Sequence, residues 1–136
     1  GIRLGYGISS DKALLERMET VRQPWSVSTP AQAAGLSALK EDHREEQTRQ
    51  LVKSERERME KELENLRIEY IPSEANFLLF NSEINWFEEL KKRGILIRDC
   101  ANYRGLGNGW YRMAVRMPEE NDRLLECMKQ VLNERS

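Results

Sequence analysis

The stretch 95-ILIRDCANYRGLGNGWYRMAVR-116 decides the fold of this chain, because it has the pattern of two strands around a glycine-rich turn. Its apolar ends, 95–99 and 110–115, are typical of strands that face a core, and Asn108-Gly109 between them favours a tight turn. The same stretch holds four arginines: Arg98, Arg104, Arg112 and Arg116. Fixed positive charges beside a core need solvent or anionic partners, so the stretch also raises a question of function.

The last strand of this stretch divides its side chains between two faces. Alternation puts Tyr111, Met113 and Val115 on one face, which we expect to join the core. Arg112 and Arg116 share the other face. Two interpretations of that face are open: the arginines form ion pairs with the many glutamates, or they bind an anionic ligand. The glycines of the turn do not decide between them, because they lack the strand-to-helix context of a nucleotide-binding loop.

Segments around this stretch predict the other strands and helices of one compact unit. Residues 76–80 have the apolar character of a buried strand. Asn85 is a favourable N-cap for a helix that ends at Arg93, with Gly94 as its stop signal, and Pro118 opens a last helix. The apolar stripe of that last helix consists of Leu124, Leu125, Met128, Val131 and Leu132. We therefore predict an α+β fold with helices packed on a small, mainly antiparallel sheet.

A long, highly charged helix is predicted before this unit. Thr29, Pro30 and Gln32 have the pattern of a capping box with a proline in the first turn. Apolar residues then recur at mostly helical spacing, with charged residues of both signs between them. We therefore expect one helix over about 29–67, and residues 29–136 as one C-terminal domain.

The first 28 residues predict a strand and a short helix. Residues 2–8 alternate enough for a strand, and Ser9 or Ser10 can cap a helix with Asp11 in its first turn. The apolar face of this helix contains Ala13, Leu14 and Met18. Because the chain opens without Met on a segment that resembles the inside of a strand, we expect 1–28 to continue a larger domain that precedes this sequence.

The composition excludes several classes of protein. The chain has 136 residues and a net charge of −1, so no overall field draws it to nucleic acid or to a membrane surface. Its two cysteines, Cys100 and Cys127, and its one histidine, His43, predict neither a metal site nor a disulfide scaffold. Two isolated cysteines fit a reducing compartment such as the cytoplasm. The sequence has no apolar run of the roughly 20 residues that cross a membrane, and no signal-peptide pattern.

Several strings along the chain resemble one enzyme family, in the same order. They are 3-RLGYG-7, 24-PWSVSTPAQAA-34, 73-SEANFLLF-80, 93-RGILIRDC-100 and 102-NYRGLGNGWYRMAVR-116. They are similar to strings in the C-terminal third of pyridoxal-phosphate-dependent enzymes with the aspartate-aminotransferase fold, which is fold type I. Within that family, the last two strings most resemble the L-threonine-O-3-phosphate decarboxylases of cobalamin biosynthesis, and the histidinol-phosphate aminotransferases are the other similar group.

The resemblance implies that three arginines bind anions. In this family an arginine of the RLGY string contacts the phosphate of the cofactor, pyridoxal 5'-phosphate, which points to Arg3. An arginine of the last strand holds the substrate α-carboxylate, which points to Arg112, and the arginine of the ILIRDC string lies near the substrate phosphate, which points to Arg98. A guanidinium suits these tasks because it is always charged and its planar fork matches oxygens in pairs. For Arg116 we expect an ion pair instead.

The resemblance also implies what this sequence lacks. The family's Schiff-base lysine lies several residues before the RLGY string, so we expect no catalytic residue in this chain and no activity from the chain alone. Its first partner would be the missing large domain, its substrate a phospho-amino acid, and its full-length form a homodimer. A non-catalytic binding or interaction module with the same fold is the alternative from another class.

Overall fold

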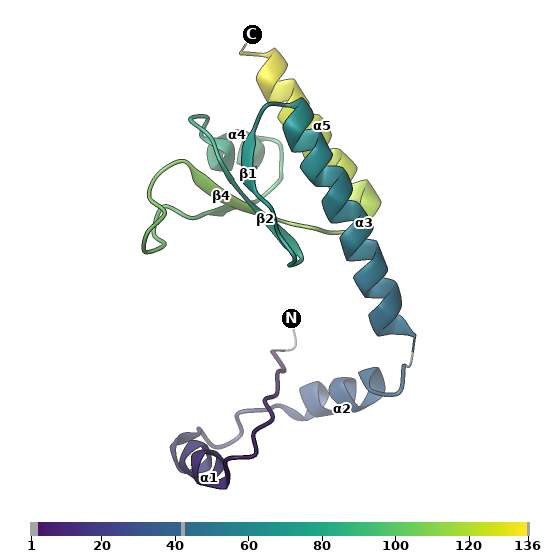
Figure 1. The fold of residues 1–136 in the computed structure, drawn as a ribbon, viewed down its shortest axis with the longest axis vertical. Helices are drawn as coiled ribbons and strands as arrows, with labels where there is room; N and C mark the ends of the chain where they lie inside the picture. Colours follow the sequence, from purple (N-terminus) through teal and green to yellow (C-terminus); the bar gives the residue numbers. More distant parts are fainter. Residues whose placement is uncertain (1–2, 42, 136) are drawn as a thin grey trace. The chain divides into compact units, whose positions relative to one another are not determined.

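The computed structural model describes residues 3–41 and 43–135, and the chain divides into two units (Figure 1). The N-terminal unit extends to Glu45 and the C-terminal unit begins at Glu46, within a helix that continues across the boundary. The described residues form five helices and one four-stranded antiparallel sheet, which confirms the predicted α+β class. The sheet lies entirely in the C-terminal unit.

The sheet has the strand order β1-β2-β4-β3, and each neighbouring pair is antiparallel. Its strands are β1 (Glu69–Ile71), β2 (Phe77–Asn81), β3 (Arg98–Asp99) and β4 (Trp110–Ala114). The strands predicted at 76–80 and 110–115 are thus confirmed as β2 and β4. We did not predict β1, because three residues are too few for an alternating pattern to stand out.

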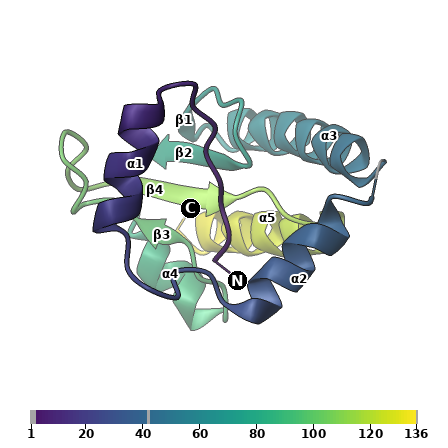
Figure 2. The same cartoon turned by 90° about the horizontal axis from the view of Figure 1, so that it is seen from below.

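Three helices cover one face of this sheet (Figure 2). They are α3 (Arg44–Asn65), α4 (Trp86–Lys92) and α5 (Pro118–Asn133). The core forms where Phe80 and Met113 of the sheet meet Met59 of α3, Trp86 of α4 and Met128 of α5, all of which are buried. Because strand side chains alternate, the neighbours of Phe80 and Met113 in the sequence point to the opposite face, away from these helices.

The strand β3 is shorter than the strand that we predicted over 95–99. The first residues of the predicted strand belong instead to the turn that ends α4. The helix α4 begins after the predicted cap Asn85 and ends in a turn at Gly94, whose φ is 74°. The N–H of Ile95 donates to the carbonyl of Leu90 at 2.9 Å, which is the bond of a Schellman motif. This bond directs the chain back over the helix, so pairing with β4 starts only three residues later.

Two helices replace the single helix predicted over 29–67. The helix α2 spans Thr29–Ala38, and α3 begins at Arg44. Between them the N–H of Lys40 donates to the carbonyl of Ser37 at 3.1 Å, which is the spacing of a turn and not of an α-helix. The break follows Leu39, which is 74% exposed, so no burial of that side chain holds the segment in a helix.

The helices of the N-terminal unit begin at caps that differ by one or two residues from the predicted ones. The carboxylate of Asp11 accepts the N–H of Leu14 at 3.0 Å and so begins α1 (Lys12–Val21), where we expected Ser9 or Ser10 as the cap. Ser28 begins α2 by accepting an N–H through its hydroxyl oxygen at 3.4 Å. The hydroxyl of Ser28 therefore has the capping function that we assigned to its neighbour in the sequence, Thr29.

The strand predicted at 2–8 does not form in its described part. Residues 3–8 have no regular secondary structure, and residue 2 lies outside the described residues. A single strand is not stable in water without a partner to complete its hydrogen bonds, and no described strand pairs with this segment. The apolar side chains here are exposed: Tyr6 is 85% and Ile8 is 91% accessible to solvent.

Candidate anion-binding site

Arg98 and Arg112 face each other across the last two strands of the sheet. They are Cα partners in the β3–β4 register, so both side chains stand on the same face of the sheet. Together they line an open hollow of about 460 Å³. The other residues that line it are Asn76, Phe77, Leu96, Ile97 and Ala114. The structure therefore brings together two of the three arginines that we singled out as site residues.

Arg112 is held in place by the sheet and by an aromatic ring. Its neighbours Tyr111 and Met113 are buried on the helix-covered face, which turns Arg112 to the open face as the alternation predicted. Its guanidinium carbon lies 5.0 Å from the ring centroid of Phe77, a cation–π contact. Within the described ranges no carboxylate lies within 4.0 Å of this guanidinium, so the ion-pair interpretation does not apply to Arg112.

Arg98 contacts the turn that follows β3. One of its guanidinium nitrogens donates to Oδ1 of Asn102 at 3.4 Å, and its guanidinium lies 5.5 Å from the ring centroid of Tyr103. Both partners are neutral, so neither compensates its charge. Like charges directly opposite each other on two strands are destabilising. An anion between Arg98 and Arg112 would remove this repulsion, which makes the hollow a candidate anion-binding site.

The other arginines of the stretch do not join this pair. Arg116 forms an ion pair with Glu120 at 2.9 Å, which confirms the expectation for that residue. Arg104 is exposed in the glycine-rich turn and is not among the residues that line the hollow. Arg3 belongs to the N-terminal unit, where it is exposed and has a φ of 60°. Its assignment to a cofactor phosphate therefore remains a prediction.

Cys100 lies close enough to the two arginines to be affected by their field. The thiol is fully buried, and burial raises its pKa. The positive charges of Arg112 and then Arg98 act in the opposite direction, by favouring the thiolate, but the burial has the larger effect. Cys100 therefore stays a neutral thiol at neutral pH and leaves the charge of the arginine pair uncompensated.

The sequence analysis missed Phe77 as a site residue. The signal was present in the strand 76–80, because alternation puts Phe77 and Leu79 on the face opposite Leu78. The β2–β4 register then puts Leu79 beside Arg112 and Phe77 two pairs further along, on the same face. A register of this kind depends on the loops between strands and cannot be obtained from the alternation alone.

The described residues offer no metal site beside these arginines. No group of three or more His, Cys, Asp or Glu side chains within residues 3–41 and 43–135 is arranged to hold a metal ion. None of the helices in these ranges is both long and apolar enough to cross a membrane. By its fold and site, the C-terminal unit is an α+β domain with two arginines that no described carboxylate neutralises, on the face of an antiparallel sheet opposite its three helices.

Comparisons with known proteins assign this domain to a family. Residues 1–127 match the model of the family described as aminotransferase class I and II, and the chain belongs to that family. It is 41% identical over 132 residues to histidinol-phosphate aminotransferase 1 of Archaeoglobus fulgidus, covering 96% of this chain and 40% of that protein. It is 38% identical over 136 residues to the threonine-phosphate decarboxylase of Salmonella typhimurium, covering 97% of this chain and 37% of that protein.

Solved structures show the same relationship. The histidinol-phosphate aminotransferase of Clostridium acetobutylicum matches with a TM-score of 0.88 and 30% identity, over 98% of this chain and 42% of that one. The chain thus spans about two fifths of the length of the relatives that it matches. Enzymes of this family depend on pyridoxal 5'-phosphate, which confirms the cofactor that the resemblance implied for a parent protein.

Proposed function

We propose that this chain provides the substrate-binding arginines of a pyridoxal-phosphate-dependent enzyme that acts on a phosphorylated amino acid. The observation that carries the proposal is the opposition of Arg98 and Arg112 on β3 and β4, without a described carboxylate to neutralise either of them. Two arginines at this spacing suit a substrate with two anionic groups. Membership of the aminotransferase class I and II family supports the same class of enzyme.

Each arginine would hold one end of the substrate. Arg112 would bind the α-carboxylate through both branches of its guanidinium, while Phe77 limits the directions in which that guanidinium can point. Arg98 would bind the phosphate, supported by Asn102 and Tyr103. When bound, the cofactor supplies an electron sink for the substrate carbon next to the nitrogen. The arginines would decide which bond at that carbon is aligned for cleavage, because they fix the orientation of the substrate.

Decarboxylation of threonine phosphate is the reaction that we propose first. That substrate has both a carboxylate and a phosphate, which is the combination that the two arginines suit. Transamination of histidinol phosphate is the second candidate. Among the similar proteins, histidinol-phosphate aminotransferases are more frequent than threonine-phosphate decarboxylases. Histidinol phosphate has no carboxylate, but 2-oxoglutarate, which accepts the amino group, has two. The arginine pair therefore supports both chemistries, and product analysis has to separate them.

The rest of the active site would come from outside these residues. Arg3 is the residue of this chain that we propose for the cofactor phosphate, since it is exposed and no described carboxylate pairs with it. The reactive lysine would come from the larger protein, so we expect the chain alone to be inactive. The alternative function is that of a non-catalytic binding module with this fold. If that alternative is correct, even the complete protein turns over neither substrate.

The test uses the complete parent enzyme with Arg112→Lys and Arg112→Ala. Removing one partner of a desolvated charge pair costs on the order of 2–5 kcal/mol, which corresponds to roughly 30- to 5,000-fold in kcat/KM. We expect a loss in this range for Arg112→Ala, and a smaller but clear loss for Arg112→Lys, which keeps the charge but not the fork. Carbon dioxide release from threonine phosphate is measured in parallel with amino transfer from histidinol phosphate.

Arg116→Ala is the matched control, because Arg116 is already paired with Glu120. We expect its kcat/KM per folded molecule to stay within about threefold of the parent value, which is under ~0.7 kcal/mol. If Arg112→Ala behaves in the same way while its melting temperature falls, Arg112 is structural and the proposed substrate contact is wrong. If neither substrate is turned over by the complete protein, the binding-module alternative is favoured.

A further inference from the structure

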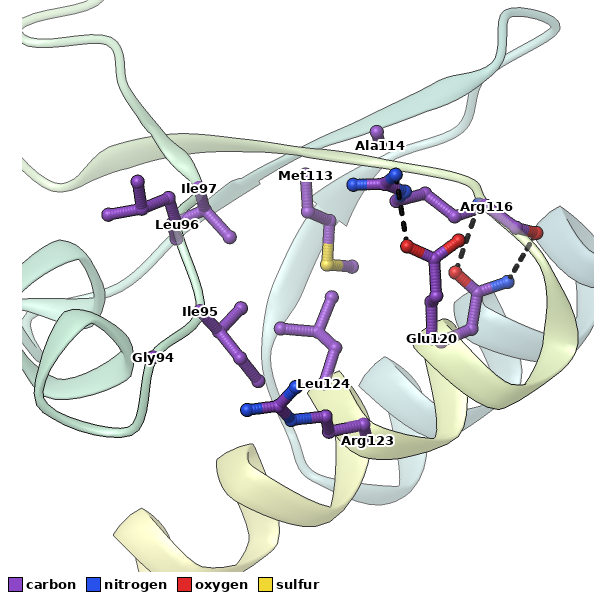
Figure 3. A pocket seen from close by; sticks show the side chains of 11 residues that line it. Gly94, Ile95, Leu96, Ile97, Met113, Ala114, Arg116, Glu120, Arg123 and Leu124 are labelled. Carbon is purple, nitrogen blue, oxygen red and sulfur yellow. Dashed lines mark hydrogen bonds and ion pairs between the residues drawn. The ribbon is translucent and has the colours of Figure 1, made fainter.

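A second hollow opens where β3 and β4 part (Figure 3). The two strands pair only at Arg98–Arg112 and Asp99–Tyr111. Within the described chain no backbone hydrogen bond joins Leu96 to Ala114, which would lie opposite each other two positions further along this register. The chain segments diverge there and leave a space of about 210 Å³ in front of α5. This space adjoins the anion-binding hollow, because Leu96, Ile97 and Ala114 line both, but it contains neither of the two arginines of that site.

The floor of this hollow is apolar. Met113, Leu124 and Ile97 are at least nine-tenths buried, and with Ile95 they point into the space from β4, α5 and the segment before β3. An apolar group of a ligand that fills this open space would remove apolar surface from water, which favours its binding.

One side of the rim has an uncompensated positive charge. Arg123 of α5 lies at the edge of the hollow, where one guanidinium nitrogen donates to the carbonyl of Arg93 at 3.5 Å. Within residues 3–41 and 43–135, no carboxylate lies within 4.0 Å of this guanidinium. On the opposite side of the rim, the charge of Arg116 is neutralised by Glu120 at 2.9 Å.

The polar amide at the back of the hollow is not available to a ligand. The side chain of Asn121 accepts the N–H of Arg116 at 3.0 Å and donates to its carbonyl at 2.9 Å. Its amide group also donates to the carboxylate of Glu55 at 2.7 Å. Among the described charged side chains that line the hollow, Arg123 is thus the one without an ion-pair partner, and it lies directly beside an apolar floor.

We propose that this hollow binds a small monocarboxylate with an apolar body. The carboxylate would pair with Arg123, and the apolar body would lie against the half-buried Ile95, with Met113 and Leu124 beneath it. A cavity of about 150 Å³ is known to admit benzene, so a space somewhat larger than that admits an aromatic ring with a short carboxylate arm. This site differs from the proposed substrate site in the charged group that it uses, because Arg123 lines only this hollow and Arg98 and Arg112 line only the other.

The experiment titrates the 136-residue chain with phenylacetate and follows the methyl signals of Met113, Leu124 and Ile95, which line only this hollow, by NMR. For a ligand of about ten heavy atoms we expect a Kd on the order of 1–10 mM. The neutral analogue 2-phenylethanol should bind about tenfold more weakly, since a hydrogen bond to a charged group is lost. Arg123→Gln should cause a similar loss, and Arg123→Lys a smaller one.

Arg112→Gln is the matched control, and it should leave the affinity for phenylacetate unchanged within about twofold, because Arg112 does not line this hollow. The proposal is overturned if the methyl signals show no saturation up to about 50 mM phenylacetate, well above the expected Kd. Equal binding of 2-phenylethanol would also overturn it, by showing an apolar depression without a carboxylate site. A loss with Arg112→Gln instead of Arg123→Gln would assign the carboxylate to the arginine pair and likewise contradict the proposal.

Discussion

The two units of the chain contain helices with equally clear local signals, yet only one of them has a core. In the N-terminal unit the helices α1 and α2 have side-chain caps, but Ala31 is the only described residue that is buried. In the C-terminal unit a cluster of side chains from three helices and the sheet surrounds Phe80 and Trp86. Caps decide where a helix begins, whereas the burial of an apolar face provides most of its stability.

The difference is clearest for residues of the same type. Leu14 and Leu15 of α1 are 38% and 42% exposed, and Trp25 is 97% exposed. Leu90 and Trp86, which lie in α4, are fully buried. The short helix α4 is therefore fixed by its tertiary contacts, and the longer helix α1 depends on its own sequence. We expect substitutions in the two units to differ accordingly.

The largest difference is expected between Phe80→Ala and Leu14→Ala. Phe80 is fully buried and lies 5.6 Å from the ring of Tyr111, so its removal leaves a cavity in the centre of the core. We expect it to lower the free energy of unfolding by about 3–5 kcal/mol, and Leu14→Ala to lower it by less than about 0.5 kcal/mol. Urea denaturation followed by circular dichroism measures both. Equal losses would mean that α1 shares a core with the sheet.

A smaller loss is expected for Asn121→Ala. The amide of Asn121 is 1% exposed and joins α3 to the end of β4, through Glu55 and the backbone of Arg116. Removing it leaves buried polar groups without partners, so we expect the free energy of unfolding to fall by about 2–3 kcal/mol. Asn133→Ala, at the exposed end of α5, is the control and should cost little. A loss of the same size at both positions would contradict this.

The hydrogen bond between Asn121 and Glu55 also makes the free energy of unfolding depend on pH. The pKa of Glu55 is lowered mainly by its hydrogen bond to Arg58 at 2.7 Å, and then by that to Asn121, against the effect of burial. Because the folded-state pKa is below the unfolded value, Glu55 stabilises the fold above about pH 4.3, and this contribution is lost as the pH falls through its folded pKa. Glu55→Gln should therefore flatten the acid side of the stability curve. Glu16→Gln on α1, where the carboxylate is exposed, is the control for the loss of one negative charge, and an equal flattening by both variants would contradict this role of Glu55.

The smallest changes in stability are expected at two helix ends that have the same backbone geometry. Gly94 ends α4 with a φ of 74°, and Arg67 occupies the equivalent place after α3 with a φ of 56°. The N–H of Ile68 donates to the carbonyl of Leu63 at 2.9 Å, as in the turn after α4. We expect Arg67→Gly to stabilise the C-terminal unit by about 1 kcal/mol and Gly94→Ala to destabilise it by a similar amount. Thermal unfolding should show shifts of opposite sign, and shifts of the same sign would contradict the shared geometry.

The sequence was sufficient for elements whose signals are local. The alternation in β4, the cap at Asn85 and the stop at Gly94 are all properties of neighbouring residues, and the structure confirms each of them. The helix break after Leu39 and the absence of a strand at 3–8 depend on what those segments are packed against, which no local pattern contains.

Individual residues of the candidate site could be predicted from the sequence, but their arrangement could not. Alternation turned Arg112 to the open face, and the family resemblance selected Arg98, but neither predicted that the two would be partners in the register. That pairing is fixed by the length of the turn between the strands and by the Schellman motif that delays the start of β3. The contact of Phe77 with Arg112 follows from a second register and was missed for the same reason.

The opposition of Arg98 and Arg112 has a consequence for how this sequence tolerates change. A neutral side chain at either position should relieve the repulsion between them, so we expect a variant that lacks one of the proposed anion-binding arginines to gain thermal stability. Screening a library of this chain for heat resistance alone should therefore enrich variants that have lost one of these two arginines. Only a screen that includes an anionic ligand would retain both guanidinium groups, because the bound anion stabilises the variants that keep them.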